Sequence, residues 1–207
     1  ERQVDLPFLQ NNFPAKGRAF HLTSLAIIDG SDADAWADFF AEQHRMGIVT
    51  TLDPNVRPML IADREAYLER LWRLMNTADI LKLSDEDLEW IFPNFDFDTA
   101  CTAVLRKTSA KLSIVTKGAK GAICYCNGLK IAVPAHPVPN LVDTVGAGDT
   151  FMATVLSYLN SADLLSQDAL TGLDQATLIA LLTRAAKAAA INCECEGCQP
   201  PTADALN

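Results

Sequence analysis

The sequence predicts an α/β fold, a three-layer α/β/α sandwich with a mostly parallel central sheet. Short apolar segments of strand length alternate with longer segments in which apolar residues recur at helical spacing. The connections between them are rich in Gly, Pro, Asp and Ser, which favour turns and helix caps. This alternation is typical of a parallel sheet covered by helices on both faces.

In the first half of the chain, the apolar segments end near residues that favour turns. The helical segments carry acidic residues near their starts, which suit a helix N-terminus. The expected strands are 19–28, 48–53 and 79–84. The expected helices are 32–47, 64–78, 85–92 and 97–110.

The second half begins with a strand at 111–118 and a hairpin at 119–135. The hairpin turn is Asn127-Gly128, a pair typical of two-residue loops between strands. A loop then leads to a glycine turn and to a helix from about Gly148, and a last helix is expected at 175–192. The residues expected on the inner face of the helix after the glycine turn are Phe151, Val155 and Leu159.

The composition excludes several classes of partner. The 207 residues are 49% hydrophobic, enough for one well-packed domain, and the net charge of −9 comes without any basic run. Nucleic acids and anionic membranes need clustered Lys and Arg, so neither is an expected partner. No apolar stretch is expected to reach the roughly 18–20 residues of a membrane span. With no secretory signal in the sequence, a cytoplasmic location is expected.

The cysteines raise the question of a metal site, because Cys193, Cys195 and Cys198 crowd one segment. A structural zinc site usually has four ligands in two separated pairs, and only the cysteines of 124–126 could complete such a set. Reduced thiols are the favoured interpretation, with zinc as the alternative. The histidines, His21 among them, show no metal or triad spacing and are interpreted as structural.

The segment DTVGAGDTF (143–151) places Asp149 inside a glycine turn at a helix start. Backbone N–H groups there attract anions, so the turn suits phosphate. A P-loop would need G-x-x-x-x-G-K-[ST], which no stretch fits. A dinucleotide fingerprint would need a third glycine where Phe151 stands. An ordinary strand-to-helix connection capped by Asp149 is the structural alternative.

The same segment resembles the second signature of the PfkB (ribokinase-like) family of carbohydrate kinases, D-T-x-G-A-G-D-x-F. The matching residues are Asp143, Thr144, Gly146, Ala147, Gly148, Asp149 and Phe151. Other stretches resemble segments of this family in the same order, and two of them, DPNVRP and ADILKLSDEDLEWI, resemble its fructokinases. They are FHLTSLAI (20–27), DPNVRP (53–58), ADILKLSDEDLEWI (78–91), VTKGAKGA (115–122) and AAAINCECEGCQPPT (188–202).

The resemblance implies a ribokinase-like fold over nearly the whole chain. It implies that residues 1–207 are the C-terminal two-thirds of a single PfkB-type sugar kinase domain. The family's N-terminal part, which carries a sugar-binding segment and strands of a lid, is not expected in this sequence. A homodimer is implied when that lid is present.

The resemblance also implies roles for individual residues. Asp149 would be the catalytic base that accepts the proton of the attacking sugar hydroxyl. The backbone of Gly146, Ala147, Gly148 and Asp149 would form an anion hole for the transferred phosphoryl group. Asn55 and Arg57 follow a strand end and would contact the substrate and the ATP phosphates, with a salt bridge in an exposed loop as the alternative.

ATP and Mg²⁺ are the implied cofactors. The residues of the implied nucleotide site are Ser84, Thr116, Lys117, Gly118 and Gly121. Asp87 would help to bind Mg²⁺. The structural alternative is that Ser84 caps a helix and Asp87 is an acidic residue in its first turn. Lys82 could neutralise phosphate charge, but a lysine at a strand end is expected to be solvated.

A monovalent cation such as K⁺ is implied near the glycine turn. The residues that would surround it are Asp143, Val145, Asn192, Cys195 and Gly197. Ala186 stands where fructokinases commonly carry an Asn that contacts adenine, so adenine recognition would differ at that position.

The leading hypothesis is an ATP-dependent fructokinase whose partners are a small-molecule sugar and ATP. A 2-keto-3-deoxygluconate kinase is the alternative enzyme, because the segment DPNVRP occurs in both groups. A nucleotide-binding remnant without catalysis is the alternative from a different class.

Overall fold

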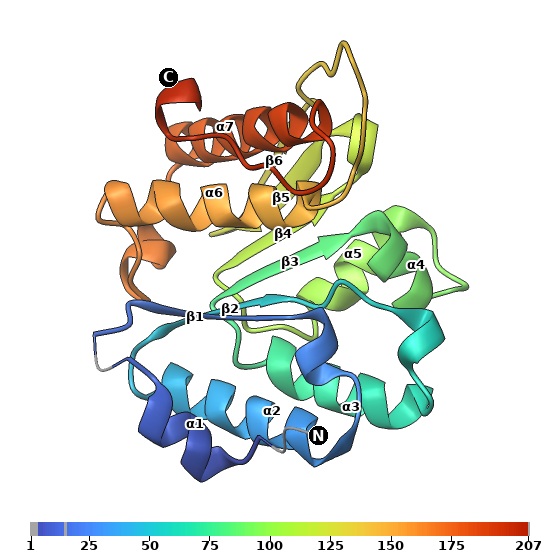
Figure 1. Cartoon of the computed structure of the whole chain (residues 1–207), viewed down its shortest axis with the longest axis vertical. Helices are drawn as coiled ribbons and strands as arrows, with labels where there is room; N and C mark the ends of the chain where they lie inside the picture. Colours follow the sequence, from blue (N-terminus) through green and yellow to red (C-terminus); the bar gives the residue numbers. More distant parts are fainter. Residues whose placement is uncertain (1–3, 15, 207) are drawn as a thin grey trace.

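The computed structural model describes residues 4–14 and 16–206; positions 1–3, 15 and 207 of the predicted domain lie outside the described residues. Over this range the chain forms the predicted α/β fold, a six-stranded sheet with helices on both faces (Figure 1). The strands are β1 (Ala19–Thr23), β2 (Val49–Asp53), β3 (Ile80–Ser84), β4 (Leu112–Thr116), β5 (Ala122–Cys126) and β6 (Leu129–Val133). The helices are α1 (Leu6–Asn12), α2 (Gly30–Arg45), α3 (Arg64–Met75), α4 (Asp85–Ile91), α5 (Phe97–Leu105), α6 (Ala147–Ser161) and α7 (Gln175–Cys193).

The strands lie in the sheet in the order of the sequence, β1-β2-β3-β4-β5-β6. Strands β1 to β4 are parallel, and β5 and β6 are added antiparallel through short connections. Asn127 and Gly128 both have positive φ, 50° and 76°, as a two-residue hairpin turn requires. The predicted mostly parallel sheet and the predicted hairpin are therefore confirmed.

Side-chain alternation along the strands builds one core on each face of the sheet. On one face, Ile80 of β3 and Ile114 of β4 pack in a cluster with α6 and α7. On the other face, Leu81 and Leu83 of β3 pack in a cluster with α2 to α5. In Figure 1, α6 and α7 accordingly lie on the opposite side of the sheet from α2 and α3.

Two predictions at the N-terminal side differ from the structure. The expected strand 19–28 is shorter, because the chain turns at Ser24, which has φ 42°, and continues as a 3₁₀ helix, Ser24–Ile27. Helix α1 was not predicted, although Asp5 caps it by accepting a hydrogen bond from the N–H of Phe8 at 2.8 Å.

Helix α7 corrects one expectation about apolar stretches. Its 19 residues are long and apolar enough to span a membrane by length and composition. In the structure, however, Leu178, Leu181 and Leu182 are buried in the cluster with α6 and strands β4 to β6. This burial is the arrangement of a core helix.

Candidate active site

The carboxyl ends of the parallel strands meet at one edge of the sheet. Thr23 of β1 pairs in register with Asp53 of β2, and Ser84 of β3 pairs with Thr116 of β4. In Figure 1 the arrowheads of these strands point to the side of the molecule where α6 begins. Ligands of open α/β sheets bind at this edge, so the predicted site residues are gathered where such a site belongs.

The predicted glycine turn is present at the start of α6, with Gly146 in the left-handed region at φ 76°. No side chain caps this helix end. The N–H of Ala147 donates to the carbonyl of Thr144 at 3.2 Å, which uses one donor of the predicted anion hole. Among the described residues, none accepts a hydrogen bond from the N–H of Gly148 or Asp149. These two donors are therefore available to an anion.

Asp143 ties the glycine turn to the segment after α7. Its carboxylate accepts hydrogen bonds from the N–H of Val145 and of Gly197, each at 3.0 Å. These two bonds hold the pKa of the Asp143 carboxyl below its usual range. The amide of the buried Asn192 donates to the carbonyl of Val145 at 2.8 Å. The residues predicted to surround a monovalent cation thus form one connected group, and the cation itself stays a prediction.

A cavity of about 580 Å³ opens beside the glycine turn, within the size range of ligand pockets. Its walls are the end of β4 with the turn after it, the loop between β6 and α6, the first turns of α6 and one side of α7. The lining residues are Thr116, Gly118, Ala119, Gly121, Ala122, Ala135, His136, Pro137, Val138, Leu141, Thr144, Ala147, Gly148, Phe151, Ala186, Ala189, Ala190 and Cys193.

Most of the predicted nucleotide turn faces this cavity. Thr116, Gly118 and Gly121 line it, and Ala186 lines its wall on α7. Lys117 is not among the lining residues; its Nζ lies 5.2 Å from the centre of the Phe97 ring, towards α5. The glycine turn and the nucleotide turn, which are separated in the sequence, therefore share one cavity.

Ser84 and Asp87 form a capping box at the start of α4. The Ser84 hydroxyl accepts from the N–H of Asp87 at 3.0 Å, and the Asp87 carboxylate accepts from the N–H of Ser84 at 2.7 Å. The other Asp87 oxygen accepts from the N–H of Val56 at 2.7 Å. This geometry accounts for the cap, and it also ties α4 to the segment after β2, where Asn55 and Arg57 lie.

Asn55 and Arg57 follow β2 at the same edge of the sheet. Asn55 has φ 40°, and its carbonyl accepts a hydrogen bond from the Ser24 hydroxyl at 3.3 Å. Arg57 is exposed, and its guanidinium donates to the neighbouring Val56 carbonyl at 3.4 Å. Among the described residues, Arg57 forms no salt bridge, and its predicted role with substrate stays a prediction.

Lys82 corrects the expectation of a solvated lysine. Its side chain is buried, with the residue 4% exposed, and its Nζ lies 2.6 Å from Oδ2 of Asp53, which is 2% exposed. Burial raises the pKa of the Asp53 carboxyl, and the Lys82 ammonium opposes that shift. A Cβ added to Gly148 would lie 3.5 Å from Lys82 Nζ, so this ammonium lies beside the first turn of α6.

The lysine's position carried a sequence signal. Ile80 and Lys82 alternate with Leu81 and Leu83, so Lys82 lies on the face of β3 that carries α6. Its partner could not be read from that alternation, because it depends on the register between β2 and β3.

His21 of β1 lies in the same charged neighbourhood. Its Nδ1 is 2.7 Å from the Thr51 hydroxyl. Burial lowers the pKa of His21 from its ordinary 6.5; the charge of Lys82 adds to this shift, while Asp53 and Asp149 oppose it. His21 therefore lies close enough to the candidate base for the charge of Asp149 to affect its pKa, and its interpretation as a structural residue stays a prediction.

The lowered pKa of His21 predicts acid sensitivity of the fold. The unfolded chain takes up the proton near pH 6.5, before the folded protein does. The contribution is therefore present above pH 6.5 and is lost as the pH falls towards the folded-state pKa. Urea unfolding at pH 7.5 and 5.5 checks this, since His21→Asn, which keeps a polar group for Thr51, should lose less stability than wild type. An equal loss in both proteins would contradict the prediction.

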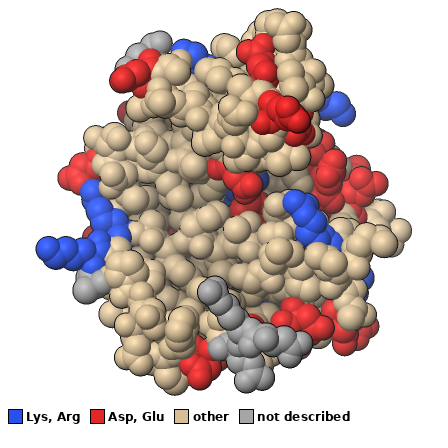
Figure 2. All heavy atoms as spheres, viewed as in Figure 1, with Lys and Arg blue, Asp and Glu red and all other residues tan. Residues whose placement is uncertain are grey.

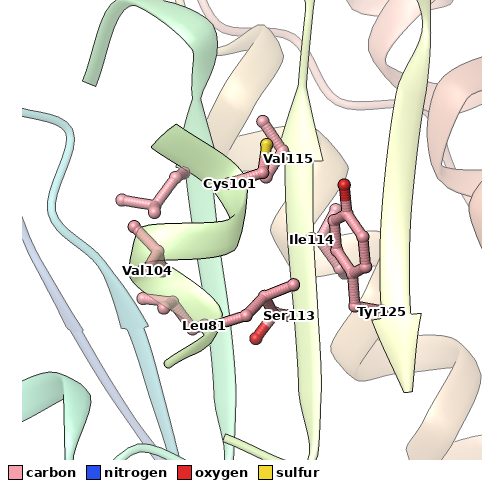
Figure 3. Close-up of a pocket in the computed structure, with 9 residues that line it drawn as sticks. Leu81, Cys101, Val104, Ser113, Ile114, Val115 and Tyr125 are labelled. Atoms are coloured by element: carbon pink, nitrogen blue, oxygen red, sulfur yellow. The ribbon is translucent and has the colours of Figure 1, made fainter. Parts of the chain in front are cut away.

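Other features of the molecule do not compete as a site. A cavity of about 10 Å³ lies between α5 and the sheet and has room for about one water molecule. Figure 3 shows residues that line it, Cys101 and Ser113 among them. Within residues 4–14 and 16–206, no group of three or more His, Cys, Asp or Glu side chains is placed to hold a metal ion. On the face in Figure 2, the described Lys and Arg side chains lie scattered.

The chain is similar to known proteins in both sequence and fold. The family described as pfkB family carbohydrate kinase matches residues 4–205. A fructokinase of Rhizobium leguminosarum bv. trifolii is 36% identical over 175 residues, which are 84% of this chain and 52% of that protein. The chain spans about half the length of the curated relatives it matches first.

Solved structures agree on the architecture. The structure of a fructokinase from Xylella fastidiosa with bound ATP has a TM-score of 0.78 and 26% identity, covering 87% of this chain and 56% of that one. A fructokinase double mutant from Vibrio cholerae O395, bound to fructose, ADP and potassium ion, has a TM-score of 0.81. The two chains are 23% identical, and the match covers 98% of this chain and 63% of the Vibrio chain. At this identity the match supports a shared fold and no more.

Proposed function

Because the chain belongs to the pfkB family of carbohydrate kinases, we propose that it transfers the γ-phosphoryl group of ATP to a hydroxyl of fructose. One observation carries the proposal: the uncapped turn at Gly148 and Asp149 borders a 580 Å³ cavity at the carboxyl edge of the sheet. Similarity to the Rhizobium fructokinase supports the choice of sugar, and similarity to the ATP-bound Xylella fructokinase supports the choice of nucleotide.

In the proposed reaction, the exposed Asp149 carboxylate accepts the proton of the attacking sugar hydroxyl. The N–H groups of Gly148 and Asp149 stabilise the charge on the transferred phosphoryl group. The base does not need a high pKa, because the transition state of phosphoryl transfer is loose and the carboxylate mainly positions the hydroxyl.

The cavity would hold the nucleotide, with the phosphates towards Gly148 and the base towards α7. Cys193, at the end of α7, accepts hydrogen bonds at its carbonyl from the N–H of Val142 and Asp143, which places this end beside the glycine turn. Ala186 lies seven residues earlier in the helix, about 10 Å away along its axis. The wall near Ala186 would therefore contact the adenine.

Mg²⁺ would accompany the ATP phosphates, as is usual for this ion. Both Asp87 oxygens already accept backbone N–H groups, so the geometry suits Asp87 as an outer partner rather than as a direct ligand. Thr116 lines the cavity and Ser84 lies next to it in the sheet. Asn55 and Arg57 are the proposed substrate contacts. The K⁺ site, the homodimer and the cytoplasmic location stay predictions.

A panel of sugars with ATP tests the proposal. We expect fructose to be phosphorylated with a higher kcat/KM than other ketoses and aldoses, measured by coupled release of ADP. Turnover restricted to 2-keto-3-deoxygluconate would favour the alternative enzyme. Binding of ATP without phosphorylation of any sugar would contradict the proposal and favour a nucleotide-binding protein without catalysis.

A further inference from the structure

The buried ion pair of Lys82 and Asp53 lies at the turn where the phosphoryl group would bind. Both side chains are on the face of the sheet that carries α6, at the carboxyl ends of β3 and β2. Gly148 has no side chain, and a Cβ placed there would be 3.5 Å from Lys82 Nζ. No side chain of residue 148 therefore separates the ammonium from the N-terminal turn of α6.

This arrangement brings two positively charged groups together at the turn. A helix N-terminus carries about half a positive charge, and a lysine ammonium beside it adds a charge of the same sign. Asp53 compensates the ammonium through Oδ2 only, because its buried Oδ1 has no hydrogen-bond partner among the described residues. Local conflicts of this kind are expected at functional sites rather than at structural ones.

The uncapped N-terminus of α6 also indicates a site for an anion. The N–H groups of Gly148 and Asp149 have no acceptor within the described chain, although most helices satisfy such donors with a cap. Gly148, which carries one of these two donors, also lies beside the Lys82 ammonium. A phosphoryl group, which carries negative charge on several oxygens, can satisfy all three.

We propose that Lys82 is a further catalytic residue, whose ammonium contacts the phosphoryl group during transfer, and that Asp53 is the positioning residue that holds it. This inference rests on the proposed kinase function. The bond that forms joins the sugar oxygen to the γ-phosphorus, and the bond that breaks joins the γ-phosphorus to the bridging oxygen of ADP. The hydroxyl proton passes to Asp149, and Lys82 keeps its proton throughout.

The first test compares Lys82→Met with Lys82→Arg. Loss of one donor to a transition-state anion typically lowers kcat by about 10²–10³-fold, so we expect that loss in Lys82→Met with a smaller loss in Lys82→Arg. The binding probes are ADP alone and ADP with aluminium fluoride plus sugar, a mimic of the transferring phosphoryl group. Lys82→Met should weaken the mimic strongly while changing the affinity for ADP alone by less than about threefold. Because Lys82→Met leaves the buried Asp53 carboxylate unpaired, a lower Tm is expected in either case; a purely structural role would weaken both affinities together.

Two further proteins separate charge from folding. Asp53→Leu combined with Lys82→Met removes both buried charges and leaves no charge unpaired, so the fold should survive while the loss of kcat persists. Lys111→Met is the matched control, because Lys111, just before β4, also pairs with a buried aspartate, Asp79, just before β3. It should lower Tm without changing the ratio of the two affinities.

The outcomes distinguish this inference from the proposed function. Suppose that the wild-type protein phosphorylates fructose and that Lys82→Met, alone or combined with Asp53→Leu, has a kcat close to that of wild type. This result would overturn the role of Lys82 and leave the kinase function standing. Absence of sugar phosphorylation by the wild-type protein would overturn the function, and this inference with it.

Discussion

Replacement of Asp149 by Asn is expected to lower kcat for sugar phosphorylation by about 10²–10⁴-fold. The amide cannot accept the hydroxyl proton, although it occupies nearly the same space. Asp149 is exposed in the first turn of α6, so the loss of its charge should cost about 0.3–1 kcal/mol of stability. Steady-state kinetics and thermal unfolding of the two proteins check these effects, and the KM for ATP should stay close to that of wild type.

Asp98→Asn is the matched control for this prediction. Asp98 is likewise exposed in the first turn of a helix, α5, and it pairs with Lys130 at 3.4 Å on the surface. Its replacement should leave kcat unchanged. If Asp149→Asn retained the turnover of wild type, Asp149 would not be the base and the turn would serve only as a structural connection.

Replacement of Gly121 by Ala is expected to destabilise the protein by roughly 3 kcal/mol and to weaken nucleotide binding. A Cβ at this position would lie 2.1 Å from the Val133 carbonyl oxygen and 2.8 Å from the Ala135 nitrogen. Gly121 also has φ 87° and ψ −149°, a conformation that is essentially restricted to glycine. Relief of the clash would move the wall that Gly121 and Ala135 contribute to the cavity.

Gly128→Ala isolates the cost of backbone strain. Gly128 has φ 76°, but nothing lies within 4 Å of a Cβ added there. It should lose only about 1–2 kcal/mol, with nucleotide affinity unchanged. Urea unfolding and titration with ATP measure both effects. Equal stability of the two variants would show that β6 and the following loop adjust freely around Gly121.

Much of the fold could be predicted from the sequence because its strands and helices differ clearly in apolar period. The hairpin turn at Asn127-Gly128 and the helix after the glycine turn are local features, and each has a local signal. The end of β1 could not be predicted, because FHLTSLAI is continuously apolar and the chain leaves the sheet at Ser24 through a positive φ. Apolar content alone does not report that turn.

The candidate site was predictable to the extent that it lies in contiguous motifs. The turn at Gly146 to Asp149 and the turn at Gly118 to Gly121 each carry several residues that match the motifs of the PfkB family. The Lys82–Asp53 ion pair could not be predicted, because its two residues lie on neighbouring strands and meet only through the register in which β2 and β3 pair. The hydrogen bond from the Ala147 N–H to the Thr144 carbonyl could not be predicted either, since it depends on the bend of the chain before α6.

The strand order of the sheet has a consequence for folding. Because β1 to β6 lie side by side in the order of the sequence, each strand pairs with the one made just before it. Pairing therefore needs only the closure of one crossover at a time, so the sheet can grow strand by strand during synthesis. One wall of the large cavity comes from α7, near the end of the described chain. A chain ending before Gln175 would contain every strand of this sheet and still lack that wall.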